Sequence, residues 1–372
     1  MKSRANPSGH RRTDSLPASG TPDRTAASRP GRSSLWALPL LLLAGCDGGN
    51  IEKYPQTIYD PRSEYADQLL ELQNLTTYLG VAVGLIVFAL IGYICYRFRY
   101  QPGMPEPEQT HGNTRLELAW TLIPAVILAI IAIPTVQTIF ATQRMPEEGT
   151  ALTVDVVGWQ WWWEFRYPIN GGRDTVYTAN EIHVPVGTPV LLRMTAGDVL
   201  HSFWVPQMGG KRDLINNKIN YISFTPREPG VYLGACAEFC GDSHALMKMR
   251  LVAHTPDSFR EWLRNEYQPA RDLTPVTPRD SAIALGKQLT TQGTCAGCHV
   301  IQGTNMVGRL GPNLTHFGRR RTLAAGILEN NAENLAAWLR NPPAIKPGSK
   351  MPNLGLKDEE IRYIVAYLQS LQ

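Results

Sequence analysis

The sequence has 372 residues, of which 43% are hydrophobic and only 18% are charged, with 28 prolines and 32 glycines. A chain of this length is too long for one small domain, so two or three modules are expected. The formal net charge of +4 comes from residues 1–45, which hold seven Lys/Arg and two Asp/Glu, and this argues against a nucleic-acid partner. Apolar residues gather in three blocks, near 35–45, 75–96 and 118–140, which excludes a plain cytosolic enzyme.

Residues 1–45 have the pattern of a signal peptide. The apolar stretch from Leu35 to Ala44 has about ten residues, half of what spans a bilayer. It ends in Leu-Leu-Ala-Gly-Cys, which resembles the processing site of bacterial lipoproteins, where the cysteine is acylated and becomes the new N-terminus. We therefore expect Cys46 to carry lipid, and the alternative is an uncleaved anchor with an unmodified Cys46.

Residues 46–145 are predicted to form a transmembrane hairpin. Two uncharged runs, at about 75–96 and 118–140, are each about 22 residues long, which at ~1.5 Å per residue crosses ~30 Å of hydrocarbon. The short loop between them carries three arginines. By the positive-inside rule this loop stays in the cytoplasm, so everything after the second helix lies on the periplasmic or outer side of a bacterial inner membrane.

Three further segments follow the hairpin. Residues 146–267 alternate apolar and polar positions, as at Val154 and Val156, between turns rich in Gly and Pro, which predicts an all-β sandwich or barrel. Residues 268–279 hold three prolines without periodicity and are expected to be a linker. Residues 280–372 place apolar residues at helical spacing, which predicts a small all-α domain.

Five residues of the β segment are candidate ligands for copper. Cys236, Cys240, His244 and Met247 lie within 12 positions, and His201 stands 35 residues before the first of them. Thiolates, imidazoles and a thioether together favour copper, whereas zinc accepts Cys and His but does not favour a thioether. A blue-copper site needs one Cys, so the second Cys implies a second copper ion bridged by the same thiolates.

The pentapeptide CAGCH near the start of the last segment is the attachment signature of c-type haem. In this signature the thiols of Cys295 and Cys298 add to the haem vinyl groups, and the imidazole of His299 ligates the iron. The motif follows a predicted helix in a region expected to be exported, which is where such haems are found. One covalent haem c is therefore predicted.

The iron needs a second ligand on the opposite face of the haem, and a thioether there gives the His/Met pair typical of electron carriers. Met351 is the expected ligand, because it precedes Pro352 in a segment that resembles the axial Met of small cytochromes c. Met306 is only seven residues from His299 and is expected to be too close to reach that face. His316 is the weaker rival.

The remaining cysteine and histidines have no such pattern. Cys95 lies inside an apolar run and is expected to behave as a small hydrophobic residue, so no disulfides are predicted. His111, His183 and His254 have no partner at ligand spacing and are expected at the surface.

From the helix pair to Val252 the chain resembles cytochrome c oxidase subunit II, and the last segment resembles a cytochrome c fused to it, as in haem–copper oxidases of the caa type. The resemblance implies a multidomain membrane protein with a two-helix transmembrane hairpin, an all-β cupredoxin-like barrel holding the binuclear copper centre CuA, and a C-terminal all-α cytochrome c domain. It also implies that Cys236 and Cys240 bridge both copper ions, while His201 and Met247 complete the ligands of one.

Four more roles follow from the resemblance. His244 and the backbone carbonyl of Glu238 would complete the other copper ion, and the Glu238 side chain would bind a magnesium ion shared with subunit I unless it is a plain surface carboxylate. Trp161, within Gly-Trp-Gln-Trp-Trp-Trp, matches the family's tryptophan that takes in electrons. Glu117, within LELAWTLIP, matches the glutamate at the mouth of a proton path into subunit I, and its alternative is a solvated charge at a helix end.

Charge separates the modules and favours docking between them. Residues 280–372 carry ten Lys/Arg and six Asp/Glu, whereas residues 46–279 have a net charge of −5. A basic cytochrome tethered to an acidic body can dock upon it.

The resemblance implies that electrons from an upstream donor, either cytochrome c or a quinol–cytochrome c reductase complex, reach haem c, then CuA, and then an oxygen-reducing haem–copper subunit. That complex reduces oxygen to water and translocates protons, and its oxygen site lies on another chain. The other oxidase subunits and membrane lipid are the further partners expected. Two alternatives stay open: a free-standing membrane-anchored electron carrier, and the CuA subunit of a related nitric oxide reductase.

Overall fold

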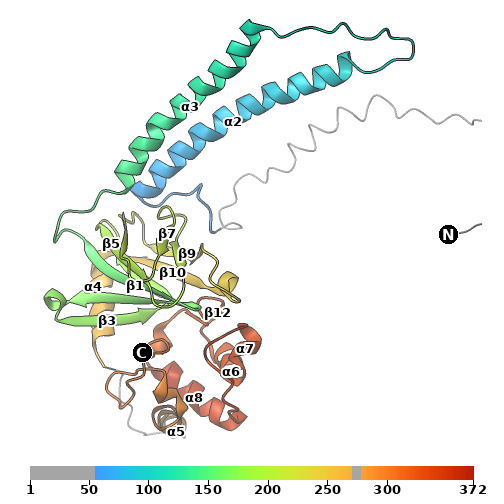
Figure 1. Ribbon diagram of the computed structural model, residues 1–372. Helices are drawn as coiled ribbons and strands as arrows, with labels where there is room; N and C mark the ends of the chain where they lie inside the picture. Colours follow the sequence, from blue (N-terminus) through green and yellow to red (C-terminus); the bar gives the residue numbers. More distant parts are fainter. Residues whose placement is uncertain (1–54, 270–277) are drawn as a thin grey trace, which may run out of the picture. The chain divides into compact units, whose positions relative to one another are not determined.

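The computed structural model describes residues 55–269 and 278–372. The predicted signal peptide and Cys46 lie outside the described residues, as does most of the predicted linker. The described chain forms two long helices, a β domain and a small helical domain, in that order (Figure 1). The predicted fold class is therefore confirmed, with two sheets facing each other as a sandwich. The boundaries between the modules remain predictions.

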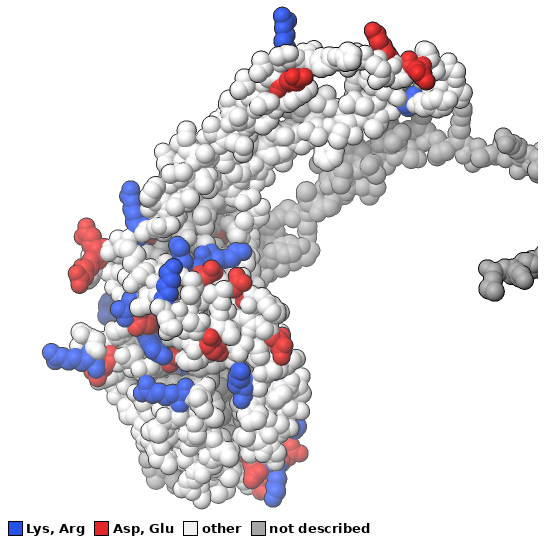
Figure 2. Space-filling view, in the orientation of Figure 1, with Lys and Arg blue, Asp and Glu red and all other residues white. Residues whose placement is uncertain are grey.

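Helices α2 (Glu64–Arg97) and α3 (Thr114–Thr142) run side by side (Figure 1). Both are long and apolar enough to cross a membrane, with a mean hydropathy of 2.4 over their most apolar windows. Figure 2 shows an uncoloured stretch along the helices between charged residues at their ends. The two predicted spans lie inside these helices, and the two prolines of the second span are accommodated within α3.

Helix α2 begins at Glu64, well before the predicted span, because its first turn belongs to the β domain. The Ser63 hydroxyl accepts a hydrogen bond from the backbone N–H of Ala66 at 3.1 Å and donates one to the backbone oxygen of Met208 at 2.7 Å. Tyr65 is 7% exposed and belongs to the core of the β domain. The N-cap therefore joins the helix to the sheets.

The β domain consists of two five-stranded sheets, with strand orders β3-β2-β1-β5-β8 and β4-β10-β9-β6-β7. Each sheet contains one parallel pair, β1 with β5 and β10 with β4, and its other pairs are antiparallel. The strands are β1 (Leu152–Trp159), β2 (Trp162–Ile169), β3 (Asp174–Ala179), β4 (Glu181–Pro185), β5 (Val190–Ala196), β6 (His201–Trp204), β7 (Arg212–Leu214), β8 (Asn220–Phe224), β9 (Gly230–Cys236) and β10 (Lys248–His254).

Alternating residues of these strands form the core between the sheets, as the sequence predicts. Val154 of β1 and Met249 and Leu251 of β10 are fully buried, whereas the intervening Lys248 and Arg250 are half-buried. After β10, helix α4 (Pro256–Tyr267) adds its buried side to the same core. The core thus holds the strand ends that carry the candidate copper ligands in place.

The C-terminal domain is built on helices α5 and α8, which pack against each other at Gly286. A Cβ atom there would lie 2.0 Å from the backbone oxygen of Tyr363 in α8, so this crossing requires glycine. Ile361, Ile364 and Leu368 of α8 are buried, as their helical spacing predicts. Its elements are α5 (Pro278–Gln292), η3 (Thr294–Gly297), η4 (Phe317–Arg319), β11 (Thr322–Leu323), β12 (Leu328–Glu329), α6 (Ala332–Arg340), α7 (Pro342–Ile345) and α8 (Asp358–Ser370).

Candidate metal centres

The five predicted copper donors gather where β9 ends and β6 begins. Cys236 is the last residue of β9, and Cys240 follows in the next loop. His244 opens a short 3-10 helix, and Met247 directly follows that helix, before β10. His201 is the first residue of β6, and the pairing of β6 with β9 brings it beside this loop across 35 positions of sequence.

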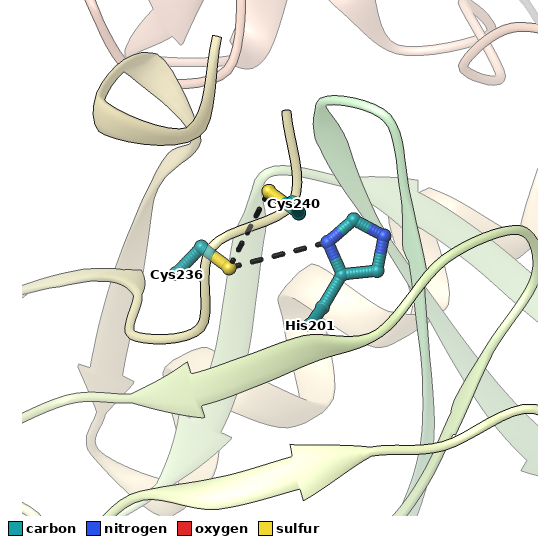
Figure 3. Close-up of side chains that lie close together, drawn as sticks. All are labelled: His201, Cys236 and Cys240. Carbon is teal, nitrogen blue, oxygen red and sulfur yellow. Dashed lines mark hydrogen bonds between the residues drawn. The ribbon is translucent and has the colours of Figure 1, made fainter. Parts of the chain in front are cut away.

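Distances between the donor atoms are those of a closed cluster. The Sγ atom of Cys236 lies 3.8 Å from the Sγ of Cys240 and 4.0 Å from the Nδ1 of His201 (Figure 3). The Cys240 Sγ lies 3.6 Å from the Nδ1 of His244 and 3.9 Å from the Sδ of Met247. The nitrogen and sulfur donors of all five residues therefore lie close together, which fits the predicted copper chemistry.

The two cysteines cannot both be ionised there without a cation. The hydrogen bond between the two thiols is the main reason that the pKa of Cys236 falls to about 3. The same contact raises the pKa of Cys240. Two thiolates 3.8 Å apart would repel each other strongly in a buried site. A metal ion between the sulfurs removes that repulsion, so the donor set is suited to copper bridged by two thiolates.

Asp198 orients His201, and sequence reasoning missed it. The Nε2 of His201 lies 2.9 Å from the Oδ1 of Asp198, which leaves Nδ1 directed at the Cys236 sulfur. Burial by itself lowers the pKa of His201. The hydrogen bond to Asp198 and the contacts with Cys236 together outweigh burial, so the pKa of His201 is raised. A carboxylate behind a ligating imidazole is the usual second partner at a metal site. An acidic residue three positions before a predicted ligand was the available signal.

The backbone oxygen of Glu238 also faces the cluster. It accepts a hydrogen bond from the Cys236 Sγ at 3.2 Å, so this carbonyl lies beside the thiolates as the resemblance implies. The Glu238 side chain is half-buried. The neighbouring Phe239 is 76% exposed, and its ring meets His244 edge-on at 5.8 Å.

Trp161 connects the copper loop to the C-terminal domain. Its indole Nε1 donates a hydrogen bond to the backbone oxygen of Cys240 at 2.9 Å, and its side chain is 6% exposed. Lys346 of the C-terminal domain donates to the backbone oxygen of Trp161 at 2.6 Å. A Cβ atom on Gly348 would lie 2.6 Å from the indole ring, so that segment packs directly on it. The sequence suggested Trp161 but not its partner Lys346.

The candidate haem site is prepared by the orientation of His299. Its Nδ1 lies 2.7 Å from the backbone oxygen of Pro312, so Nδ1 donates and Nε2 is left for the iron. Burial lowers the pKa of His299, which favours the neutral, ligating imidazole. Cys295 and Cys298 are half-buried and unpaired, as covalent attachment requires. These residues fit a c-type haem.

The three rivals for the second iron ligand differ in their surroundings. Met306 is 1% exposed within the core of the domain, whereas Met351 is half-buried at its edge. Both ring nitrogens of His316 are engaged, Nδ1 with the backbone oxygen of Gln372 at 3.1 Å and Nε2 with that of Gln268 at 3.0 Å. Met351 is therefore the candidate ligand that the packing leaves most accessible.

Comparison with known proteins places these sites in a family. The chain matches, in order, the transmembrane domain of cytochrome c oxidase subunit II over residues 52–138, the periplasmic domain of that subunit over 169–254, and cytochrome c over 283–372. Cytochrome c oxidase subunit 2 of Alkalihalophilus pseudofirmus is 37% identical over 339 residues, which cover 89% of this chain and 94% of that protein. The chain belongs to the cytochrome c oxidase subunit II family.

Further relatives resemble all or part of this subunit II. Cytochrome c oxidase subunit 2 of Bacillus subtilis is 34% identical over 91% of this chain and 96% of that protein. The crystal structure of the periplasmic domain of subunit II from Bradyrhizobium japonicum is 29% identical, covers 33% of this chain and 96% of that one, and has a TM-score of 0.31. The two family matches over residues 169–254 and 283–372 show that this subunit II has a CuA domain and a fused cytochrome c domain.

Glu117 of this subunit II lies in the first turn of α3. Its Oε1 accepts a hydrogen bond from the backbone N–H of Asn113 at 3.3 Å, while the Asn113 side chain accepts from the N–H groups of Arg115 and Leu116. This reciprocal arrangement resembles a capping box, with the glutamate one position later than in the usual motif. The side chain thus has a local structural role, and its proton-path role stays a prediction.

The prediction that His183 and His254 are isolated surface residues is wrong. The parallel pairing of β4 with β10 brings them together, so that the Nδ1 of His183 lies 2.8 Å from the Nε2 of His254. His183 also stacks on Trp262 with ring centroids 4.2 Å apart. Burial, followed by the proximity of His254, lowers the pKa of His183 well below its ordinary value. His111 is exposed, as predicted.

Proposed function

We propose that this subunit II takes up electrons for a bacterial oxidase of the caa type, receiving them at haem c and passing them through CuA to the oxygen-reducing subunit I. The complex would reduce oxygen to water and translocate protons, with the oxygen site on that other chain. Bound haem c and CuA would each store one electron, which is the chemistry that the proposal needs. The upstream donor would be a cytochrome c or a quinol–cytochrome c reductase complex.

The convergence of the copper donors carries this proposal. Cys236 and Cys240 would bridge two copper ions, because their sulfurs lie 3.8 Å apart with a further donor on either side. His201 and Met247 would complete the ligands of one copper ion. His244 would complete the other, together with the backbone oxygen that faces the Cys236 sulfur.

The C-terminal domain would hold haem c through one segment on each face. Cys295 and Cys298 would form the thioether links, and His299 would supply the imidazole, since its Nδ1 is held by a backbone oxygen. Met351 would supply the opposite ligand, because the rival Met306 belongs to the buried core.

Three further roles are part of the proposal. The Glu238 side chain would bind a magnesium ion completed by subunit I, and Glu117 would stand at a proton path in that partner. Cys46 would carry lipid, with α2 and α3 crossing the membrane and both cofactor domains on the outer side. Mass spectrometry of the mature protein tests the lipid, and an unmodified Cys46 or an intact residue 1 would contradict it.

Copper content and electron paramagnetic resonance test the copper assignment. The purified protein should hold two copper ions that share one unpaired electron when oxidised. A ratio of one copper ion per chain, or a four-line spectrum from a single copper nucleus, would refute the binuclear site.

Flash reduction of haem c in the purified complex tests the electron route. Copper should be reduced with first-order kinetics that do not depend on protein concentration, because donor and acceptor belong to one chain. Trp161→Ala should slow this step if the ring lies on the route. A rate proportional to protein concentration would mean that the tethered domain does not serve its own copper centre.

A further inference from the structure

Two buried charges join the cytochrome domain to the CuA domain, one supplied by each. Glu181 of β4 is 1% exposed, and its carboxylate accepts hydrogen bonds from the backbone N–H groups of Arg321 and Thr322, at 2.9 and 2.8 Å, and from the Thr322 hydroxyl at 2.9 Å. Lys346 is 4% exposed, and its Nζ donates to the backbone oxygens of Trp161 and Ala324 at 2.6 and 3.2 Å.

Glu181 binds backbone groups and one hydroxyl of the facing domain, and Lys346 binds one backbone oxygen of the facing domain, that of Trp161, and one of its own domain, that of Ala324. Backbone donors and acceptors have fixed positions, so each charged group is satisfied in one arrangement of the two domains. A shifted arrangement that kept the interface closed would leave a carboxylate or an ammonium group buried without its partners, which is strongly unfavourable. The two charges therefore select a single docked position.

Neighbouring contacts hold the same two segments of the cytochrome domain. The backbone N–H of Lys248 donates to the backbone oxygen of Ala325 at 3.1 Å, and the guanidinium of Arg250 donates to that of Gly326 at 3.2 Å. The Ser243 hydroxyl donates to the backbone oxygen of Pro347. These bonds flank the Glu181 and Lys346 contacts, so the interface is continuous along β10 and the copper loop.

The docked position covers the ring that touches the copper loop. One part of the Trp161 indole donates to the Cys240 backbone oxygen, and Gly348 packs against another part of the same ring. Only 6% of the residue remains exposed. A separate protein therefore cannot stack on Trp161 unless the cytochrome domain first moves away.

We propose that Glu181 and Lys346 are positioning residues that latch the cytochrome domain over Trp161, in the position from which haem c would serve the copper centre. This inference rests on the proposed function and adds the residues that hold the two domains together. One electron leaves the donor protein, reduces the cytochrome domain, and then leaves that domain for the copper centre.

The first experiment follows stopped-flow reduction of the intact wild-type oxidase by a reduced soluble cytochrome c. Haem c should be reduced first with a rate proportional to donor concentration, and copper should follow at a rate that does not depend on it. Copper reduced in parallel with haem c, at a rate that rises with donor concentration, would overturn the proposal without the need for any variant.

The second experiment compares Glu181→Gln, Lys346→Met and the double variant with Lys350→Met, a matched control in which an exposed lysine of the same loop loses its charge. Hydrogen exchange of the backbone amides at 321–326 should speed up about tenfold or more in the latch variants, since hydrogen bonds to charged groups are lost. The control should match wild type. Equal exchange in latch variants and control would overturn the latch.

Spectra and kinetics separate a positioning role from general damage. The haem c absorption and the copper resonance should be unchanged in the latch variants, while transfer from haem c to copper slows and a parallel, donor-dependent reduction of copper appears. Altered spectra would indicate damage to a cofactor site and count against a positioning role. If transfer between the cofactors failed in wild type, the proposed function would fail, yet amide exchange would still test the latch.

Discussion

Gly348 and Gly355 provide a matched pair for measuring how closely the cytochrome domain contacts Trp161. Both have a left-handed backbone, with φ of +71° and +63°, and both flank Met351. Alanine at either position carries the cost of that conformation, about 1–2 kcal/mol. A Cβ atom on Gly355 would have no neighbour within 4 Å, so Gly355→Ala measures this cost alone.

Gly348→Ala adds a clash with the indole. Its Cβ would lie 2.6 Å from the ring, against at least 3.4 Å for an ordinary contact, and 3.0 Å from the Asp242 carboxylate. The ring cannot easily retreat, because Trp161 is hydrogen bonded to the Cys240 backbone oxygen and packs on Gly241. Overpacking of this kind costs about 1–3 kcal/mol, which corresponds to roughly 5- to 150-fold in the docking equilibrium.

The assay compares both variants in the purified oxidase by thermal unfolding of the cytochrome domain and by the rate of electron transfer from haem c to copper. Gly355→Ala should lower the unfolding temperature and leave the transfer rate unchanged. Gly348→Ala should lower the unfolding temperature at least as much and slow the transfer as well. Equal transfer rates in the two variants would refute the close contact between Gly348 and Trp161.

Two further outcomes follow. Gly286→Ala should destabilise the cytochrome domain by about 1–3 kcal/mol or more in thermal unfolding, because its Cβ would lie 2.0 Å from the Tyr363 backbone oxygen, and an unchanged midpoint would contradict that packing. Met351→Ala should abolish the absorption band of a thioether–iron bond. Met306→Ala should keep that band and lower the stability of the cytochrome domain by about 2–5 kcal/mol, because Met306 is buried. Loss of the band in Met306→Ala instead of Met351→Ala would exchange the two roles.

The sequence predicted both cofactor motifs because most of their ligands are local. Cys236, Cys240, His244 and Met247 come from a single loop and the residues beside it, and CAGCH is a single turn of chain. The two long apolar helices were predictable for a similar reason, since an uncharged run of this length is typical of a membrane span. The start of α2 was not, because Ser63, which caps it, is held by a hydrogen bond to the distant Met208 backbone oxygen.

The tertiary structure decided which distant groups complete and connect these motifs. His183 meets His254 through a parallel strand pair, and Asp198 meets His201 behind the copper site. Lys346 lies 185 residues from Trp161 in the sequence, and neither shows a pattern that would pair it with the other. Such contacts leave no periodic trace in the sequence, because they depend on how one folded domain docks on another; whether a buried charge finds its backbone partners is set by that geometry alone.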